Sequence, residues 1–224
     1  IKYKSFIFLK SEYENKFKNI EGFEKLTTET QDKYGNQLAD EELFEVIIEK
    51  DLLQLLAFQV GSEVSMTELA TQLSMNKATV EKYISILEQA FIVFRLSGYS
   101  KNLRKEVTKM DKIYFYDNGI RNAILSNFAP LELRTDTGIL WENFMISERV
   151  KRNAYSGSYA NLYFWRTHDQ KEIDLIEEED GQLHTFEFKW NQRSKVTMPQ
   201  TFSTSYPNST FTVITPDSFW PFVS

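Results

Sequence analysis

The pair Asp180-Gly181 constrains the fold of this chain more than any other feature of its sequence. An Asp-Gly dipeptide between two β-rich runs is a strong signal for a two-residue hairpin turn, and here the runs are residues 172–177 and 183–190. Such a turn sets the pairing register of the strands that it joins. The sequence therefore predicts a β-hairpin in which Asp174 lies directly opposite Glu187.

One face of this hairpin is predicted to be charged, because side chains alternate between the two faces of a strand. We expect that face to carry Glu172, Asp174, Glu187 and Lys189, and the other face to carry Ile173, Leu175, Phe186 and Phe188. Two carboxylates that face each other, with side-chain roots about 5 Å apart, repel and destabilise a ladder. A divalent cation would remove that repulsion, and magnesium accepts one or two carboxylates together with water and phosphate oxygens.

A second interpretation of the same face needs no metal. Lys189 would lie opposite Glu172 and form a cross-strand ion pair, and the face would be solvated like many charged hairpin faces. Glu142 argues against it, because this carboxylate belongs to a preceding helix that is apolar around most of its circumference. A carboxylate in such surroundings needs a partner, and Arg149, two turns further on, is the candidate within the helix.

Upstream of that helix, the pattern predicts three helices followed by a hairpin. Apolar residues recur at helical spacing over residues 40–58, a capping box at residues 65–68 (SMTE) starts a second helix, and Asn76 caps a third. Two β-rich runs follow, residues 91–96 and 112–116, with a basic loop between them. This order of elements is typical of a winged helix.

In a winged helix the second helix of the pair enters the major groove and the wing contacts backbone phosphates. The candidate DNA contacts are Lys77, Thr79, Lys82, Arg104 and Lys105. Residues 65–112 carry eight basic against five acidic side chains, although the whole chain has a net charge of −6. A site for a polyanion is therefore expected in this part of the chain. The same packing also serves protein contacts, so a protein-docking surface is the alternative to DNA binding.

Composition excludes several kinds of site. The chain has no cysteine, which rules out a disulfide, a thiolate zinc site and a cysteine nucleophile, so a metal must be held by oxygen or imidazole ligands. No apolar run approaches the roughly 18 residues that span a bilayer. We therefore expect a cytoplasmic protein without a membrane partner.

Five stretches, taken in order, resemble the C-terminal region of bacterial and archaeal AAA-type predicted ATPases. They are residues 112–119 (KIYFYDNG), 137–144 (TGILWENF), 163–166 (YFWR), 172–174 (EID) and 187–189 (EFK). Each stretch alone is a weak signal, and the ordered set is the specific one. The resemblance covers roughly residues 40–195.

The resemblance implies an α+β or α/β fold in three parts. Residues 1–60 would be a helical segment that is a remnant of, or linker from, an upstream ATPase module. Residues 61–118 would form the winged helix, and residues 119–224 a restriction-endonuclease-like mixed-sheet domain of the PD-(D/E)xK superfamily. The sequence contains no Gly-x-x-x-x-Gly-Lys-Ser/Thr motif, so ATP is expected only in the missing upstream module. A homo-oligomer is one possible assembly of the full-length protein.

Roles for single residues follow from the same resemblance. Asp174 and Glu187 would hold Mg²⁺ or Mn²⁺, Glu142 would complete or orient the metal shell, and Lys189 would orient or activate the attacking water. Ile173 stands where the superfamily's motif has proline. If the site is catalytically active, we expect a Mg²⁺-dependent hydrolase of the endonuclease type. The alternative is a non-catalytic DNA-binding or protein-interaction module that keeps a degenerate nuclease fold.

Overall fold

The computed structural model describes residues 50–100, 111–193 and 196–224. Within these ranges seven strands form one mixed sheet, in the order β1-β3-β2-β4-β5-β6-β7, and helices pack against it. The predicted mixture of helices and a mixed sheet is confirmed. The helix predicted over residues 40–58 is described from residue 50, and residues 50–58 are helical. Arg104 and Lys105 lie outside the described residues.

Two capped helices begin the described N-terminal half. They are α4 (Met66–Gln72) and α5 (Lys77–Gln89). The Ser65 hydroxyl accepts the Glu68 N–H at 3.3 Å, and Asn76 Oδ1 accepts the Thr79 N–H at 2.8 Å. Each side chain satisfies a backbone donor that the first helical turn leaves without a partner. Both predicted helix starts are therefore confirmed.

Three antiparallel strands accompany these helices. They are β1 (Glu63–Val64), β2 (Val93–Gly98) and β3 (Asp111–Phe115). β3 lies between the other two, with Lys112 opposite Glu63 on β1 and Phe115 opposite Val93 on β2. The sheet continues beyond β2, because Ser97 and Gly98 pair in parallel with the first strand of the C-terminal half.

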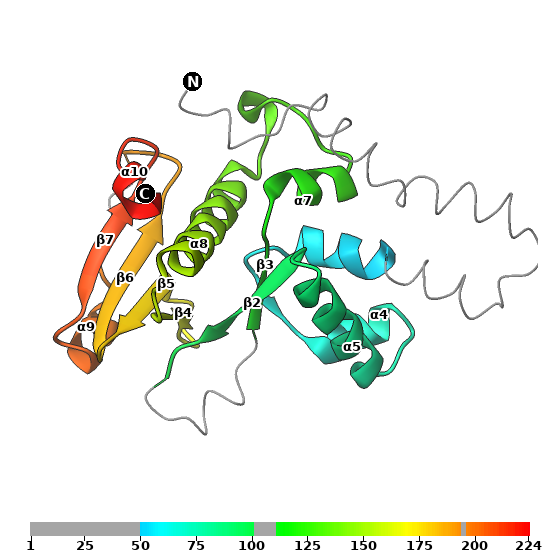
Figure 1. Ribbon diagram of the computed structural model, residues 1–224, viewed down its shortest axis with the longest axis horizontal. Coiled ribbons are helices and arrows are strands. Elements are labelled where there is room, and N and C mark those ends of the chain that lie inside the picture. The colour runs from blue at the N-terminus through cyan, green and yellow to red at the C-terminus, as the bar shows by residue number, and fades with distance from the viewer. Residues whose placement is uncertain (1–49, 101–110, 194–195) are drawn as a thin grey trace, which may run out of the picture.

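The C-terminal half alternates helices and strands around the rest of the sheet. Its elements are α7 (Asn118–Ile124), η1 (Leu131–Leu133), α8 (Thr137–Ser156), β4 (Asn161–Arg166), β5 (Glu172–Glu179), β6 (Gln182–Phe188), α9 (Gln200–Ser205), β7 (Thr210–Ile214) and α10 (Trp220–Val223). α8 runs between the β2–β3 half and the β4–β7 half of the molecule (Figure 1). None of the helices in the described ranges is both long and apolar enough to cross a bilayer.

The β5–β6 hairpin has the predicted register. Asp180 and Gly181 have φ values of +51° and +76°, the left-handed conformations that a type I′ turn requires, and Leu175 lies opposite Phe186. The ladder ends at that pair, one position before Asp174 and Glu187. β7 pairs in parallel with β6 along the outer edge of the sheet, and its side chains are mostly exposed or half-buried.

A β-bulge changes which side chains share a face. Between β4 and β5 the pairing passes from Tyr163–Ile176 to Trp165–Ile173, so β5 holds one more residue than β4 across this interval. Such a bulge breaks the alternation of side chains locally. Ile173 packs in the cluster around Phe202 of α9, whereas Leu175 packs in the cluster of α8. The prediction that Ile173 and Leu175 share a face was therefore wrong.

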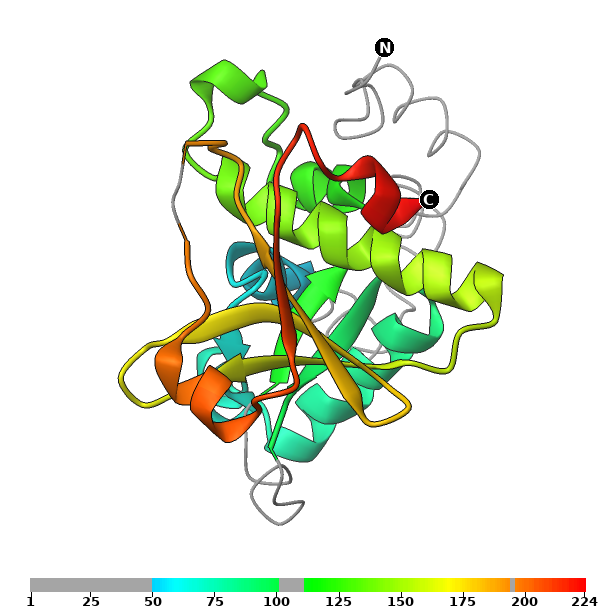
Figure 2. The same ribbon diagram turned by 90° about the vertical axis from the view of Figure 1, so that its left-hand side faces the viewer.

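The sheet separates two hydrophobic clusters. The larger one joins the N-terminal helices to α8 and includes Ile84, Phe115 and Trp141. The smaller one gathers around Phe202 on the other side of β4–β6. Figure 2 shows α8 and α9 on opposite sides of these strands. The larger cluster therefore includes residues of both the predicted winged helix and the predicted nuclease-like domain.

Candidate metal centre

The four residues predicted for a metal site come from three elements. Glu142 lies in α8, Asp174 on β5 and Glu187 on β6, and Lys189 follows the end of β6. Burial, the nearby Glu142 and the nearby Glu187 together raise the pKa of the Asp174 carboxyl well above its ordinary value. Lys189 opposes that rise. The other three charged groups are therefore close enough to influence Asp174.

Asp174 is held by the backbone of the neighbouring strand. Its Oδ2 accepts the Phe188 N–H at 2.7 Å, and only 7% of the residue is exposed. The Phe188 N–H lies beyond the last backbone pair of the β5–β6 ladder. The Asp174 carboxylate therefore accepts a hydrogen bond from a backbone donor that the ladder leaves without a partner on β5. The bulge in β5 thus presents Asp174 to the end of β6.

Glu187 and Lys189 form an ion pair on their own strand end. Lys189 Nζ donates to Glu187 Oε1 at 2.6 Å. Burial lowers the pKa of Lys189, but Asp174 and Glu187 outweigh this effect and leave its pKa above the ordinary value. The alternative that paired Lys189 with Glu172 across the hairpin was wrong, because Glu172 has other partners.

Glu142 is held by two residues of β3 that the sequence analysis did not include in the site. Tyr114 donates its hydroxyl hydrogen to Glu142 Oε1 at 2.6 Å, and Lys112 Nζ lies 3.6 Å from the same oxygen. Lys112 and Tyr114 alternate with apolar residues on a buried strand, and a lysine on such a strand was the signal that could have identified them.

Arg149, the partner expected for Glu142, pairs with a different carboxylate. Its guanidinium makes two hydrogen bonds to Glu177 on β5, one of them from Nε at 3.1 Å. Asn153 Nδ2 donates to the same carboxylate at 2.6 Å. Burial raises the pKa of Glu177, but these hydrogen bonds outweigh it and hold the pKa below the usual range. The predicted Glu142–Arg149 contact was wrong, because Arg149 lies on the part of α8 that faces Glu177.

Glu172 completes the charged cluster. Its Oε1 forms a short ion pair with Lys112, and its Oε2 lies 3.6 Å from Arg166 Nε. Lys112 is 1% exposed and lies over the ring of Phe164, with Nζ 5.2 Å from the ring centroid. A buried lysine therefore joins the carboxylates of α8 and β5.

The donor set fits a hard divalent cation. Each of the three predicted carboxylates uses one oxygen for a protein donor: Asp174 Oδ2, Glu187 Oε1 and Glu142 Oε1. Within the described residues no protein donor forms a hydrogen bond with the second oxygen of any of them. As they stand, no three acidic or histidine side chains in the described ranges converge on one ion position. A pair of carboxylates with water completes the shell of magnesium, so Asp174 and Glu187 are the pair that fits.

The predicted DNA contacts of α5 lie at or near the surface. Lys77 and Lys82 are exposed, and Lys77 Nζ lies 3.5 Å from Glu81 one turn further on. Thr79 is half-buried, and its hydroxyl donates to Asn76 Oδ1 at 3.0 Å. The Thr79 side chain therefore belongs to the helix cap, and the two lysines are the cationic groups that α5 presents to solvent.

The residues that directly follow Lys189 in the sequence line a cavity of about 710 Å³. Trp190, Asn191 and Arg193 line it from the segment after β6, and Leu131 and Glu132 line it from η1. The ring of Trp190 also packs edge-on against Trp141, with centroids 5.7 Å apart. An aromatic ring, an amide and a guanidinium therefore border this open space.

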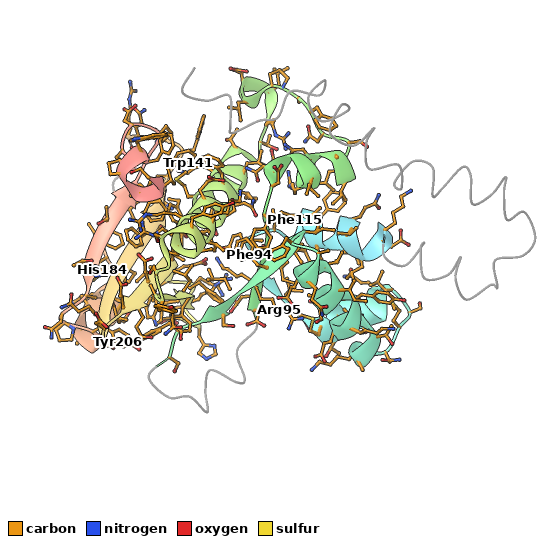
Figure 3. All side chains as sticks on the ribbon, viewed as in Figure 1. Phe94, Arg95, Phe115, Trp141, His184 and Tyr206 are labelled. Carbon is orange, nitrogen blue, oxygen red and sulfur yellow. The ribbon has the colours of Figure 1, made fainter. Side chains whose placement is uncertain are left out.

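His184 contacts the edge strand of the sheet. Its Nδ1 is 3.0 Å from the hydroxyl of Thr210 at the β6–β7 edge. Figure 3 shows His184 at the left edge of the molecule and Phe115, the last residue of β3, near its middle. A packing role at the sheet edge accounts for it.

Comparisons with known proteins find domains and relatives whose names state no activity. Residues 42–131 match the model of a domain of unknown function (DUF8612), and residues 137–217 match that of another domain of unknown function (DUF4143). The chain is similar to the uncharacterized protein Rv2008c of Mycobacterium tuberculosis and to the uncharacterized protein Mb2031c of Mycobacterium bovis, each 31% identical over 137 residues. The aligned stretch is 60% of this chain and 30% of each relative. No solved structure matches the chain.

Proposed function

We propose that this chain carries a divalent-metal-dependent phosphodiesterase site of the PD-(D/E)xK type that acts on nucleic acid. The observation that supports it is the arrangement of three carboxylates from α8, β5 and β6. Each is held through one oxygen by a protein donor and keeps its second oxygen available, with the Lys189 ammonium beside them. Carboxylates prepared in this way are what a hard cation and a phosphate group require.

Asp174 and Glu187 would hold Mg²⁺ or Mn²⁺, and Glu142 would orient the metal shell from α8. When bound, the ion supplies Lewis acidity toward a phosphodiester and toward water. Lys189 is an ammonium group, because the neighbouring carboxylates raise its pKa. It therefore serves as a hydrogen-bond donor that orients a phosphate oxygen or water and stabilises the charge developing on phosphorus-bound oxygen, and it does not serve as the base.

The reaction expected at this site is hydrolysis of a phosphodiester. A water oxygen forms a bond to phosphorus, the bond from phosphorus to one ester oxygen breaks, and that oxygen leaves with a proton. The cavity beside Trp190 and Arg193 would accept the strand next to the reacting phosphate, because aromatic rings stack on bases and guanidinium groups bind phosphate.

DNA binding through a winged helix is the second part of the proposal. Residues 50–58, β1, α4, α5, β2 and β3 follow one another in the order that a winged helix has, and Lys77 and Lys82 lie on the exposed side of α5. The resemblance to AAA-type predicted ATPases would place this activity downstream of an ATPase module. Either relative is more than three times as long as the aligned stretch, so the function of the whole protein belongs to the same proposal.

One observation favours a non-catalytic binding module as the second candidate. Within the described ranges the carboxylates do not converge on one ion position, and lysines already contact Glu142 and Glu187. A module of this kind would bind nucleic acid or protein without turnover.

Cleavage of labelled DNA separates the two candidates. Wild type, Asp174→Ala and Asp169→Ala would be incubated with single- and double-stranded DNA in Mg²⁺ or Mn²⁺. Asp169 is an exposed aspartate in the turn before β5 and is the matched control. The proposal expects metal-dependent cleavage by wild type and Asp169→Ala, and a loss of at least 100-fold in Asp174→Ala, roughly as for a group that binds a catalytic ion. Absence of cleavage in all three proteins, with DNA binding retained, would establish the binding module.

A further inference from the structure

The carboxylate cluster contains two lysines that have different surroundings. Lys189 is about one-third exposed, whereas Lys112 is almost completely buried between α8, β3 and β5. We propose that Lys112 is a built-in cation that bridges Glu142 and Glu172 in place of a second metal ion, so that the site takes a single divalent ion, at Asp174 and Glu187. This inference rests on the proposed function, because it concerns the metal stoichiometry of the same site.

The contacts of Lys112 are those of a bridging cation. Its Nζ forms a short ion pair with Glu172 Oε1 and lies 3.6 Å from Glu142 Oε1. Its third neighbour is the ring of Phe164, with the centroid 5.2 Å from Nζ. A lysine ammonium is a compact point charge with three donors, and these neighbours surround it. Lys112 therefore acts on the carboxylates and not on a substrate, which makes it a positioning residue.

Tyr114 keeps Glu142 turned toward Lys112. Its hydroxyl contacts the same oxygen, Glu142 Oε1, at 2.6 Å. Both groups come from β3, two residues apart on one face of the strand, and both contact Glu142 of α8. Glu142 Oε2 stays available to the shell of the ion at Asp174 and Glu187.

The charges of the network agree with one divalent ion. Among the described residues, five carboxylates belong to it: Glu63, Glu142, Glu172, Asp174 and Glu187. Three cationic side chains contact them: Lys112, Arg166 and Lys189. Two negative charges remain, which one divalent ion balances. Without Lys112 three would remain, two of them on the Glu142–Glu172 side.

The test compares the metal response of Lys112→Gln with that of wild type and a matched control. Arg149→Gln removes another buried cation from a carboxylate, Glu177, which lies outside the cluster. Mn²⁺ would be titrated into each protein while the melting temperature and the number of bound ions are measured. Both variants should melt below wild type without metal, because each leaves a buried carboxylate without its cation.

We expect Mn²⁺ to distinguish them. Lys112→Gln should bind two ions and show a Mn²⁺-induced rise in melting temperature that exceeds the wild-type rise by roughly 5–10 °C at a concentration about 100-fold above Kd. Arg149→Gln should bind one ion and show the wild-type rise. An unchanged stoichiometry and an unchanged metal response in Lys112→Gln would overturn the inference.

Wild type supplies a measurement that does not depend on the folding of a variant. One Mn²⁺ per chain supports the inference, and two per chain overturn it. A wild-type chain that binds one ion and cleaves no DNA would refute the phosphodiesterase while leaving the role of Lys112 intact. A wild-type chain that cleaves DNA with two ions bound would support the phosphodiesterase and refute the role of Lys112.

Discussion

Asn143 of α8 binds both backbone groups of Phe115 at the end of β3. Its Oδ1 accepts the Phe115 N–H at 2.8 Å, and its Nδ2 donates to the Phe115 carbonyl at 3.0 Å. The side-chain amide thus forms hydrogen bonds with the backbone N–H and carbonyl at the end of the strand, as a neighbouring strand would. Because Glu142 precedes Asn143, this contact also fixes Glu142 beside Tyr114. It joins the residues matched by the first domain model to those matched by the second.

Loss of the Asn143 amide should destabilise the fold. Asn143→Ala removes the two hydrogen bonds to Phe115 and a third to Asn118, and leaves buried backbone groups without partners. We expect the free energy of unfolding to fall by about 3 kcal/mol, measured by urea denaturation. Asn161→Ala, at an exposed position of β4, is the control and should change it by less than about 0.5 kcal/mol. Equal losses in the two variants would contradict the role of Asn143.

Tyr114→Phe should weaken metal binding without unfolding the chain. The variant removes only the hydroxyl that holds Glu142 Oε1, so Glu142 loses one of its two contacts on β3. Groups that orient a metal shell typically contribute about 10-fold or more in affinity. We therefore expect the Kd for Mn²⁺ to rise by about 10-fold. Tyr116→Phe, just beyond the end of β3, should leave the Kd unchanged. A Tyr114→Phe protein with wild-type affinity would show that Glu142 does not depend on this contact.

Stability below pH 5 should depend on Asp136. Hydrogen bonds from Arg134 and Arg121 outweigh burial and lower the pKa of Asp136 from 3.8 to about 2. A carboxyl whose pKa is lower in the folded chain contributes stability above its unfolded pKa, and that contribution is lost as the pH falls from about 4 toward 2. We expect it to be roughly 2 kcal/mol at pH 5 and smaller at pH 3.

Asp136→Asn isolates that contribution. The difference in unfolding free energy between wild type and Asp136→Asn should shrink between pH 5 and pH 3, measured by urea denaturation at both values. Other titrating groups act on both proteins and cancel in the difference. A difference that stays constant, or grows as the pH falls, would contradict the pKa direction of Asp136.

DNA binding through α5 should show in the salt dependence of affinity. Replacing both Lys77 and Lys82 with alanine removes the two exposed lysines of the helix. If both contact phosphates, the slope of log affinity against log salt should become less steep by about 2 units. Lys151→Ala, on α8, should leave the slope unchanged. Equal slopes for wild type and the double variant would indicate that α5 does not contact DNA.

Local signals in the sequence were sufficient for much of the fold. The Asp180-Gly181 turn predicted the register of β5 and β6, and Ser65 and Asn76 predicted where α4 and α5 start, because these features act within a few residues. The bulge in β5 was not predictable in this way, because it arises from pairing with β4.

Partners distant in the chain were the least predictable part of the site. Lys112 and Glu172 are 60 residues apart, on strands that β2 and β4 separate in the sheet, and only their long side chains bring the charges together. Arg149 pairs with Glu177, which is 28 residues away in the sequence. This partner was not predictable either, because the spacing of residues along a helix does not indicate which strand a side chain will contact. The four charged residues were identified without the lysine and tyrosine that hold one of them.

The position of a bound ion is the most direct test of the central claim. Crystals grown in saturating Mn²⁺ would be measured at a wavelength where manganese scatters anomalously. The proposal expects one anomalous peak, within coordination distance of the carboxylates of Asp174 and Glu187, and its absence in Asp174→Asn. A map without a peak at these carboxylates, or with its peak elsewhere in both proteins, would contradict the metal centre.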